Sequence, residues 1–412
     1  MFFFYTSNSR GLDIFGWYWS RKGDDVVKGL YRLGLVGILC GVLAACASPS
    51  FAEESKTEYF FKSIEISGFV DTYYSYNFSR PNDRRGSTPG FTRDKAEGDW
   101  LDVRAFDRED NSFTLDNVEI AVFKPSTEKD PIGFGFITNY GEIAQRLTFV
   151  SSDGRVDGAS GGQSFTVSQG FVTYKAPVGE GLDFKFGKFA SWIGAEFWQS
   201  VDNPNFSRSL LYENAITWTN TGLAMSYPLL EKLTTSLYFV NGWDTFVDNN
   251  NGKTVGYQFN WAVADNTHFI VNGSHGPEQT DNSSNYRHFW DIVLATKPFE
   301  KTAFNLNFDY GTEDGAAVNG SNGKWWGFAG IVSRDITDVV SLALRGEYFD
   351  DTDGARRGID NLDIWELTFT TNIKIRESLL VRPEIRYDEA NQGIFNGHDG
   401  EFTTAIDLAY MF

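Results

Sequence analysis

The chain has little cysteine, proline or methionine and almost no long apolar run. Its 412 residues include 2 Cys, 11 Pro and 3 Met, and both cysteines, Cys40 and Cys46, lie near the N-terminus. The residues after Cys46 can therefore form neither a disulfide scaffold nor a thiolate metal site. No later stretch approaches the roughly 20 consecutive apolar residues of a transmembrane helix. If the chain spans a membrane, it must do so as a closed barrel.

Positive charge is also scarce, with 36 Lys and Arg against 55 Asp and Glu. This acidic balance argues against a nucleic-acid partner, because phosphate binding requires a basic patch. The abundant residues are 37 Phe, 18 Tyr, 12 Trp and 41 Gly, a composition that favours strands and turns. The mean hydropathy of −0.32 is that of a soluble protein, but lipid-facing and lumen-facing residues alternate in a barrel and cancel in such an average.

Residues 1–52 are predicted to be an N-terminal extension and a secretory signal peptide. Lys28 and Arg32 precede an apolar run at 33–45, and the A-x-A-like triplet Ser50-Phe51-Ala52 follows it. A basic flank, a run too short to span a bilayer and a small-residue site are typical of a cleaved signal. Cleavage after Ala52 would leave 31 Lys and Arg and 52 Asp and Glu, a net charge of −21.

A second interpretation of the same region is a lipoprotein signal. Leu43-Ala44-Ala45-Cys46 resembles a lipoprotein box, in which Cys46 would carry the lipid. Residues 1–27 precede the basic segment with which a signal normally begins. Translation could therefore start later, at a codon that does not encode methionine. In either interpretation, residues 53–412 are predicted to form one outer-membrane barrel.

From about residue 64 onward, apolar and polar residues alternate in short segments, as they do on the two faces of a strand. The first segment has Ile64, Ile66, Val70, Tyr74, Tyr76 and Phe78 on one face and Glu65, Ser67, Asp71, Ser75 and Asn77 on the other. Near Phe113 the apolar phase changes after Leu115, which predicts a β-bulge. Between Trp325 and Val332 nearly every residue is apolar or Gly, and the faces cannot be assigned.

Sixteen such strands can be counted, and the connections between them alternate in length. Short connections are expected at 125–131, 177–181, 228–231, 264–266, 298–301, 336–338 and 376–378. Long polar ones are expected at 79–111, 151–163, 191–220, 244–253, 274–285, 311–322, 350–361 and 389–400. This pattern predicts an all-β fold: a transmembrane antiparallel up-and-down β-barrel with short periplasmic turns and long extracellular loops.

The C-terminal strand has Phe402, Thr404, Ile406, Leu408, Tyr410 and Phe412 on one face. A last strand that ends on an aromatic residue resembles the signal read by the outer-membrane barrel assembly machinery. We therefore expect that machinery and outer-membrane lipid as partners of the chain, and the outer membrane as its location.

Several strings resemble the OmpL-like β-barrel porin family of Gram-negative outer membranes. They are GFVDTYY at 68–74, NSFTL at 111–115, GKF at 187–189, GAE at 194–196, NPNFSRS at 203–209, NGWD at 241–244, LRGEYF at 344–349, ELT at 366–368 and RPEIRYD at 382–388. The chain departs from the family at 217–222, where TWTNTG stands in place of a Pro followed by His-Thr-Gly. The resemblance implies a porin but no particular cargo.

Charged residues on the last strands are candidates for the pore lining. These are Arg345, Glu347, Glu366, Arg382, Glu384 and Arg386, which all lie opposite their aliphatic neighbours. Arg or Lys facing lipid at mid-depth would cost about 2–4 kcal/mol, so the set is expected to face the lumen. There the groups could pair across strands and stiffen the wall, or remain unpaired and set ion selectivity.

The segment at 191–220 stands about where a porin-like loop would fold inward and narrow the pore. Glu196, Asp202, Arg208 and Glu213 would then border the constriction. The alternative is a solvated external loop.

Other chemistry has weaker support. The acidic, Gly-ended runs at 248–252 and 350–354 could hold Ca²⁺, but no closing Glu follows either, and turn chemistry explains them more simply. The four histidines lie in no nucleophile motif, although Ser274, His275 and Asp291 could be combined into a hydrolase triad. We therefore expect no enzyme, no metal and no cofactor.

The function predicted from the sequence is passive diffusion of small hydrophilic solutes or ions through the barrel, with a preference for cations that follows from the acidic charge. The alternatives are a structural or adhesive barrel plugged by residues 191–220, and an outer-membrane hydrolase. A homotrimer is a further expectation.

Overall fold

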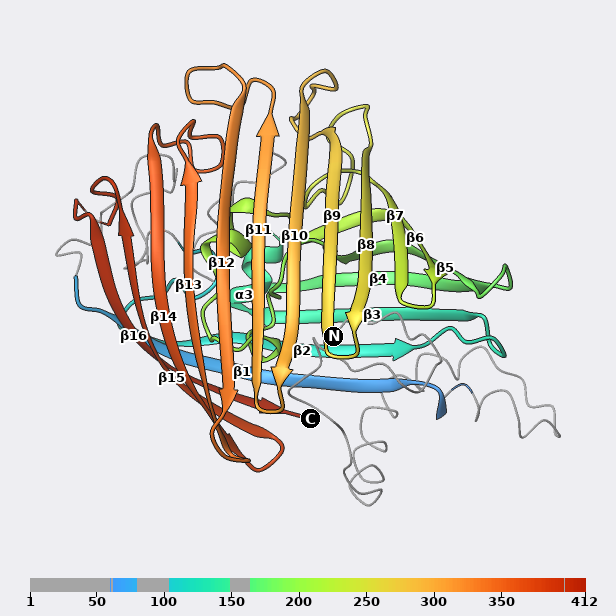
Figure 1. Ribbon diagram of the computed structural model, residues 1–412, viewed down its shortest axis with the longest axis horizontal. Helices are drawn as coiled ribbons and strands as arrows, with labels where there is room; N and C mark the ends of the chain where they lie inside the picture. Colours follow the sequence, from blue (N-terminus) through green and yellow to red (C-terminus); the bar gives the residue numbers. More distant parts are fainter. Residues whose placement is uncertain (1–59, 61, 80–103, 149–163, 396) are drawn as a thin grey trace.

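The computed structural model describes residues 60, 62–79, 104–148, 164–395 and 397–412. The predicted signal peptide, its cleavage site and Cys46 lie outside these residues. The described chain forms a closed antiparallel up-and-down barrel of sixteen strands, each paired with its neighbours in sequence and β1 with β16 (Figure 1). The predicted fold class and strand number are confirmed.

The strands are β1 (Glu65–Asn77), β2 (Ser112–Lys124), β3 (Ile132–Gly141), β4 (Ser164–Ala176), β5 (Leu182–Ala190), β6 (Thr219–Leu230), β7 (Leu233–Val240), β8 (Thr254–Ala264), β9 (Thr267–Pro277), β10 (Tyr286–Phe299), β11 (Thr302–Glu313), β12 (Gly323–Asp335), β13 (Val340–Asp351), β14 (Leu362–Ile375), β15 (Leu379–Ala390) and β16 (Gly400–Met411). In the described residues between the strands there are three short helical segments: α3 (Glu142–Thr148), η2 (Ser200–Asp202) and η3 (Leu211–Ala215). Among the described residues, none of the helices has the length and apolar character needed to cross a membrane.

The connections alternate in length as predicted. Seven connections of two to seven residues follow the even-numbered strands from β2 to β14, and the eight that follow the odd-numbered strands have between eight and 34 residues. Both ends of the barrel chain, the start of β1 and the end of β16, therefore lie at the short-turn end. That the long loops face the cell exterior remains a prediction.

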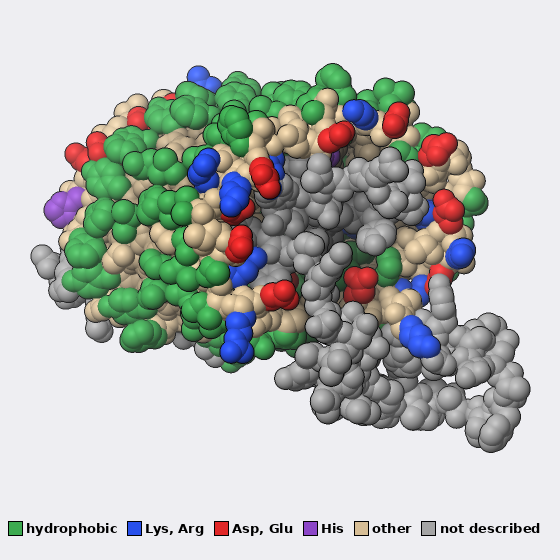
Figure 2. All heavy atoms as spheres, turned by 60° about the horizontal axis from the view of Figure 1, so that its bottom comes forward, with side chains coloured by type: hydrophobic (Ala, Val, Ile, Leu, Met, Phe, Trp, Pro, Cys, Tyr) green, Lys and Arg blue, Asp and Glu red, His purple; other side chains and the backbone are tan. Residues whose placement is uncertain are grey.

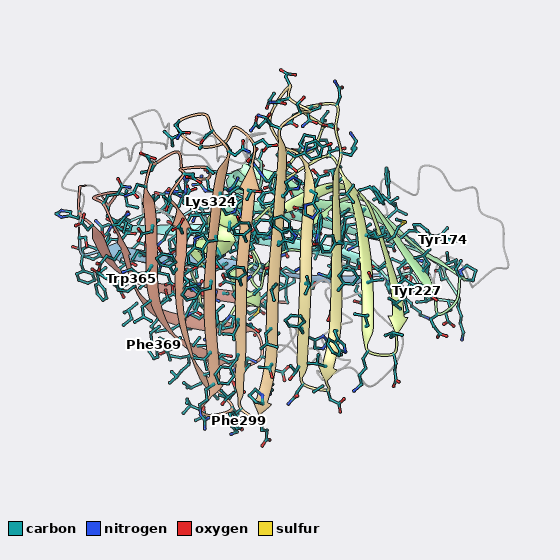
Figure 3. The ribbon with its side chains drawn as sticks, turned by 45° about the horizontal axis from the view of Figure 1, so that its top comes forward. Tyr174, Tyr227, Phe299, Lys324, Trp365 and Phe369 are labelled. Atoms are coloured by element: carbon teal, nitrogen blue, oxygen red, sulfur yellow. The ribbon has the colours of Figure 1, made fainter. Side chains whose placement is uncertain are left out.

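The alternation of charged and apolar residues determines which face of a strand points into the barrel. On β14, Trp365 and Phe369 project outward (Figure 3), whereas Glu366 and Thr368 are buried in the barrel. The same phase holds for the other strands, so the apolar side chains cover the wall and charged ones gather at its ends (Figure 2). This is the arrangement expected of a barrel in lipid, where a charge on the outer face at mid-depth is costly.

Two local features of the strands can be compared with the sequence analysis: a bulge that was predicted and a stretch whose faces could not be assigned. The predicted bulge is present, since the register of β1 and β2 shifts between Asp71 and Thr72 and leaves Asp116 as the extra residue. The unassigned stretch on β12 places Trp325 inward and Phe328 outward, both among apolar or small neighbours. Its inner face is apolar because it packs on η3 rather than facing water.

The barrel is closed at its C-terminal residue. The backbone N–H of Gly68 donates to the Phe412 carbonyl at 3.0 Å, and the Phe412 N–H donates to the Gly68 carbonyl at 2.9 Å. Gly68 is required here because a Cβ at this position would lie 2.7 Å from the Phe412 ring and 2.3 Å from the Glu119 carbonyl oxygen. The aromatic ring thus covers a glycine on the outer face of the neighbouring strand.

We expect deletion of Phe412 to weaken barrel closure, because it removes both of these hydrogen bonds and the ring that covers Gly68. The loss should be roughly 1–3 kcal/mol of unfolding free energy, measured by urea titration of the barrel refolded in lipid vesicles. Ile406→Ala, on the same face of β16 but within the strand, is the control for lost apolar surface. Equal stability of the deletion variant and the wild type would contradict this account of closure.

Candidate functional site

Three segments at the long-loop end turn inward and lie inside the barrel. They are residues 104–110 before β2, α3 after β3, and residues 191–218 between β5 and β6; Figure 1 shows α3 between the front and rear walls. None of the residues 191–218 is exposed, and most are buried. We call residues 191–218 the lumen segment.

Two wall carboxylates bind the backbone of the lumen segment. Glu384 on β15 accepts hydrogen bonds from the N–H groups of Phe206 at 2.7 Å and Ser207 at 3.1 Å. Glu347 on β13 accepts from those of Leu210 at 2.6 Å and Leu211 at 3.1 Å. An irregular segment cannot pair its own backbone donors, and at membrane depth such donors must be satisfied by protein. The two carboxylates meet this requirement.

Arg345 joins the lumen segment to two strands. Its guanidinium pairs with Glu366 on β14 at 2.7 Å and with Glu196 of the segment at 3.0 Å. It also donates to the Ser207 carbonyl at 2.6 Å. Glu347 and Glu366 stand directly opposite one another on β13 and β14, and Arg345 lies close to both carboxylates. A guanidinium with its five donors can satisfy several acceptors at once, which suits this position.

Arg382 and Arg386 on β15 extend the same contact. Arg382 pairs with Asp407 on β16 at 2.5 Å and donates to the Ser200 carbonyl at 2.6 Å. Arg386 pairs with Asp388 at 2.7 Å and donates to the Arg208 carbonyl at 2.7 Å. All six predicted pore-lining residues therefore face inward, and each contacts an oppositely charged group or the lumen segment.

Strands β1, β2 and β10 bind further parts of the lumen segment. Asp71 on β1 accepts from the Ser200 hydroxyl, and Glu119 on β2 accepts from Gln199 at 3.3 Å. On β10, Asp291 accepts from the N–H of Gly194 at 3.4 Å. The segment thus crosses the lumen from β5 to β15 and contacts strands on several sides of the barrel.

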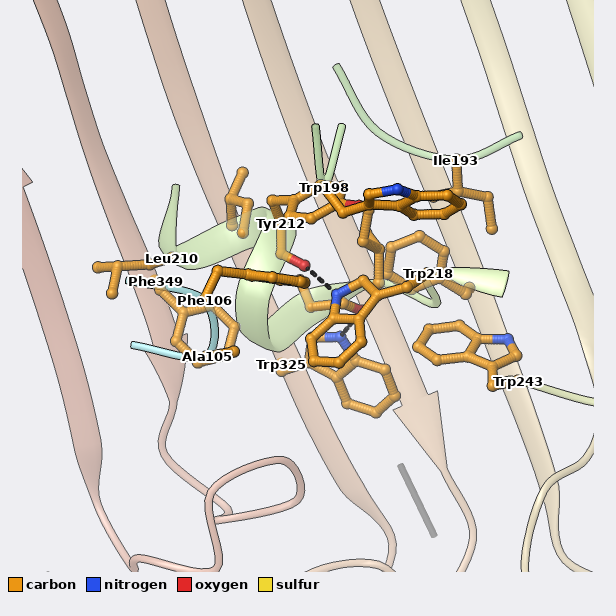
Figure 4. Packing of buried hydrophobic residues seen from close by; sticks show 14 of the residues in the cluster. Ala105, Phe106, Ile193, Trp198, Leu210, Tyr212, Trp218, Trp243, Trp325 and Phe349 are labelled. Carbon is orange, nitrogen blue, oxygen red and sulfur yellow. Dashed lines mark hydrogen bonds between the residues drawn. The ribbon is translucent and has the colours of Figure 1, made fainter. Parts of the chain in front are cut away.

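Aromatic residues pack around the lumen segment (Figure 4). Trp218 donates from its indole nitrogen to the Tyr212 carbonyl at 2.8 Å, and Trp325 donates to the Ala215 carbonyl at 3.1 Å. Phe106, from the segment before β2, lies against Trp218 with 4.7 Å between ring centroids. One buried apolar cluster, which also includes Ile143 and Leu147 of α3, therefore joins all three inserted segments to the wall.

The four predicted constriction residues lie in the lumen segment but differ in their surroundings. Glu196 pairs with Arg345, and Arg208 lies 3.7 Å from Asp116 and over the ring of Phe106. Glu213 is buried in η3, and Asp202 is half-buried at the end of η2. The segment is folded inward rather than solvated.

The inward course of the other two segments was not predicted, since residues 104–110 were placed in the long polar connection at 79–111 and no loop or helix was expected at 142–148. Arg104 pairs with Asp107 at 2.7 Å and with Asp388 on β15 at 3.2 Å. In α3, Glu142 accepts from the Tyr73 hydroxyl at 2.6 Å and lies 3.5 Å from Arg146. The spacing of Glu142 and Arg146, four residues apart, is a helix signal that was available in the sequence.

The hypothetical hydrolase triad is contradicted by the alternation of β9. Ser274 and Asp291 face the lumen, where the Ser274 hydroxyl accepts from the indole of Trp243 at 3.1 Å. His275 follows Ser274 in the strand and lies on the outer face, beside Trp290. The wall of the barrel therefore separates the histidine from the other two side chains.

The two acidic runs that could hold Ca²⁺, at 248–252 and 350–354, form turns. Asp351 accepts hydrogen bonds from the N–H groups of Arg356 at 3.0 Å and Arg357 at 2.7 Å, and Gly354 has a φ of +64°. In the other run, Asn250 accepts from the N–H of Gly252 at 2.7 Å. These oxygens are already used to close loops.

Burial changes the ionisation of acidic groups outside the strands. It raises the pKa of Glu213 to about 8, with Asp107 adding to the shift and Arg386 and Arg104 opposing it. Burial likewise raises the pKa of Glu142 to about 7, against the effect of Arg108. An acid that loses water without gaining a full cationic partner favours its neutral form.

These features define a sixteen-stranded porin-type barrel with an inserted segment. The chain belongs to the family described as putative beta-barrel porin-2, OmpL-like, which matches residues 63–412. It is an outer-membrane protein, as this family and the fold indicate. No curated protein matches the chain significantly.

Solved structures of similar fold include several porins. The chain is 10% identical to in-vitro folded OmpT of Vibrio cholerae in its trimer form, with a TM-score of 0.55 over 85% of this chain and 99% of that one. It is 9% identical to an anion-selective porin from Comamonas acidovorans, with a TM-score of 0.53 over 85% and 99%. Salmonella typhi OmpF, in complex with daunomycin, gives 10% identity and a TM-score of 0.54 over 85% and 97%. At this identity the likeness concerns the fold alone.

We expect Glu384→Gln to loosen the lumen segment, because an amide presents one acceptor oxygen and a donor where two backbone N–H groups now point at a carboxylate. Hydrogen–deuterium exchange should accelerate at Phe206 and Ser207 by at least about tenfold. Glu389→Gln, at the loop end of the same strand, should leave this exchange unchanged. Unaltered exchange in the Glu384 variant would contradict the anchoring role.

Glu213 should make stability depend on pH. Its folded-state pKa of about 8 exceeds the ordinary 4.5, so its contribution is complete below pH 4.5 and is lost as pH rises to about 8. Relative to Glu213→Gln, the wild type should lose up to about 1.4 kcal/mol for each pH unit in that window. Urea titrations in lipid vesicles across the window would measure this, with Glu231→Gln at an exposed turn as the control. A constant difference between wild type and the Glu213 variant would refute it.

Proposed function

We propose that the barrel allows passive diffusion of small hydrophilic solutes or ions across the outer membrane, and that the lumen segment sets the narrowest part of the path. The family and the fold support the class of function. The observation that carries the finer proposal is the crossing of the lumen by residues 191–218, held by charged groups of the wall. An inserted segment of this kind limits the size of solute that can pass.

A preference for cations is the second part of the proposal. Among the described residues, nineteen Asp or Glu side chains and ten Lys or Arg side chains are buried, and the acids stay in excess when Glu213, with its raised pKa, is left out. Several of these carboxyl groups, such as Glu384 and Asp291, accept hydrogen bonds from neutral amides, which satisfy the oxygens without adding positive charge to the lumen. The resulting negative field raises the local concentration of cations.

A second candidate is a structural or adhesive barrel with a plugged lumen. It is favoured by the cluster of Trp198, Trp218, Trp243 and Trp325 packed with their neighbours inside the barrel. This function would require neither a solute path nor any selectivity, and conductance measurements separate it from diffusion.

We further propose the barrel assembly machinery and outer-membrane lipid as partners, and a homotrimer as the assembled state. The last strand leads to an aromatic C-terminal residue whose side chain is exposed on the outer face. This supports the barrel assembly machinery as a partner. The trimer form printed for the similar OmpT structure supports the assembly only through fold.

The refolded barrel should give stepwise conductance in planar bilayers, and a salt gradient should give a reversal potential of cation-selective sign. Glu384→Gln should increase the conductance or the frequency of opening, because it releases part of the lumen segment, whereas Glu300→Gln at an exposed short turn should not. Absence of steps in both wild type and the Glu384 variant would favour the plugged barrel. Anion-selective reversal would refute the cation preference while leaving diffusion intact.

A further inference from the structure

We propose that His275 and His288 form a two-histidine metal site on the outer face of the barrel, suited to a divalent transition ion such as Cu²⁺, Ni²⁺ or Zn²⁺. The two residues stand directly opposite one another on β9 and β10, which run side by side in Figure 1. They are two of only four histidines in the chain. This site is separate from the lumen and does not depend on the proposed diffusion.

Both imidazoles lie outside the barrel. In β9 the residues on either side of His275, Ser274 and Gly276, are buried toward the lumen, and in β10 Arg287 and Phe289 are buried while His288 is not. Since successive side chains of a strand alternate between faces, the two histidines share the outer face. They are half-buried and remain accessible from outside the wall.

The spacing of the two rings fits one bound ion. Their Nδ1 atoms are 3.1 Å apart. An ion at the usual metal–nitrogen distance of about 2.0–2.1 Å from both atoms would subtend an angle of about 95–100°, between the octahedral and tetrahedral values. Without an ion, one ring must donate its proton to the other, since two bare lone pairs would repel.

Aromatic neighbours fix the orientation of both rings. Tyr257 stacks on His275 with 5.8 Å between centroids, and Tyr286 stacks on His288 with 6.1 Å. Trp290 lies 5.3 Å from the His275 ring and 6.2 Å from that of His288. Gly273 makes room for this arrangement, because a Cβ there would lie 2.4 Å from the Tyr257 ring. Imidazoles held in this way lose little freedom on binding an ion.

The protein supplies only these two ligands. Within the described part of the chain, no group of three or more His, Cys, Asp or Glu is placed to hold a metal ion. Water would therefore fill the remaining positions. Neutral imidazole selects late first-row ions over Mg²⁺ and Ca²⁺, which prefer oxygen, so Cu²⁺ should bind most tightly.

Titration of the tag-free, refolded barrel with Cu²⁺ alone, in detergent without phosphate, tests the proposal. One ion should bind per chain with two nitrogen ligands in its electron paramagnetic resonance spectrum, and it should quench Trp290 fluorescence. His275→Ala and His288→Ala should each lower the affinity at least tenfold, and His275→Tyr should do the same while keeping an aromatic cover. Binding by the wild type should also weaken as pH falls below about 6.5, because the imidazoles become protonated.

His398→Ala is the matched control, since His398 is exposed in the loop between β15 and β16. It should bind Cu²⁺ as the wild type does. Loss of binding in this control, retention of binding in either single variant, or the absence of saturable one-to-one binding would each overturn the site.

Discussion

The interior of this barrel is governed by one constraint: charged groups excluded from the lipid face must find partners inside a lumen into which three segments of the chain fold. Arg345, Arg382 and Arg386 satisfy it by pairing with wall carboxylates and by donating to carbonyls of the lumen segment. The carboxylates of Glu347 and Glu384 satisfy it with backbone N–H groups. A buried group that loses its partner bears its full desolvation cost. The wall and the segment therefore stabilise one another.

The same constraint explains why an irregular segment is stable at this depth. Residues 200–211 form no regular strand, so several of their backbone donors, at 206–207 and 210–211, depend on side chains for partners. Bulk lipid offers none, and non-helical backbone at membrane depth is tolerated only where protein or water surrounds it. Two wall carboxylates supply partners for the backbone donors of the segment. One accepts at residues 206–207 and the other at 210–211. The indoles of Trp218 and Trp325 serve the neighbouring backbone acceptors, because they donate to the carbonyls of Tyr212 and Ala215.

Alternation along the strands was enough to predict sixteen strands, the inward phase of Glu366 and the bulge at Asp116, because these depend on neighbours in sequence or on an adjacent strand. The partners of lumen side chains were not predictable in this way. That Arg104 meets Asp388 depends on the path of a long connection through the barrel. The apolar inner face of β12 was ambiguous for the same reason, since only its contact with η3 explains why Trp325 needs no water.

The way in which the carboxylates are satisfied bears on the electrostatics of the lumen. An arginine that pairs with an acid cancels its charge, but an amide that donates to an acid stabilises the charge without cancelling it. Glu119 accepts from Asn139 and Gln199, and Asp291 from Asn307, so these contacts order the wall without bringing positive charge into it. The basic groups, in contrast, are largely paired with acids. The hydrogen bonds that hold the lumen segment are therefore also the basis of the cation preference that we propose.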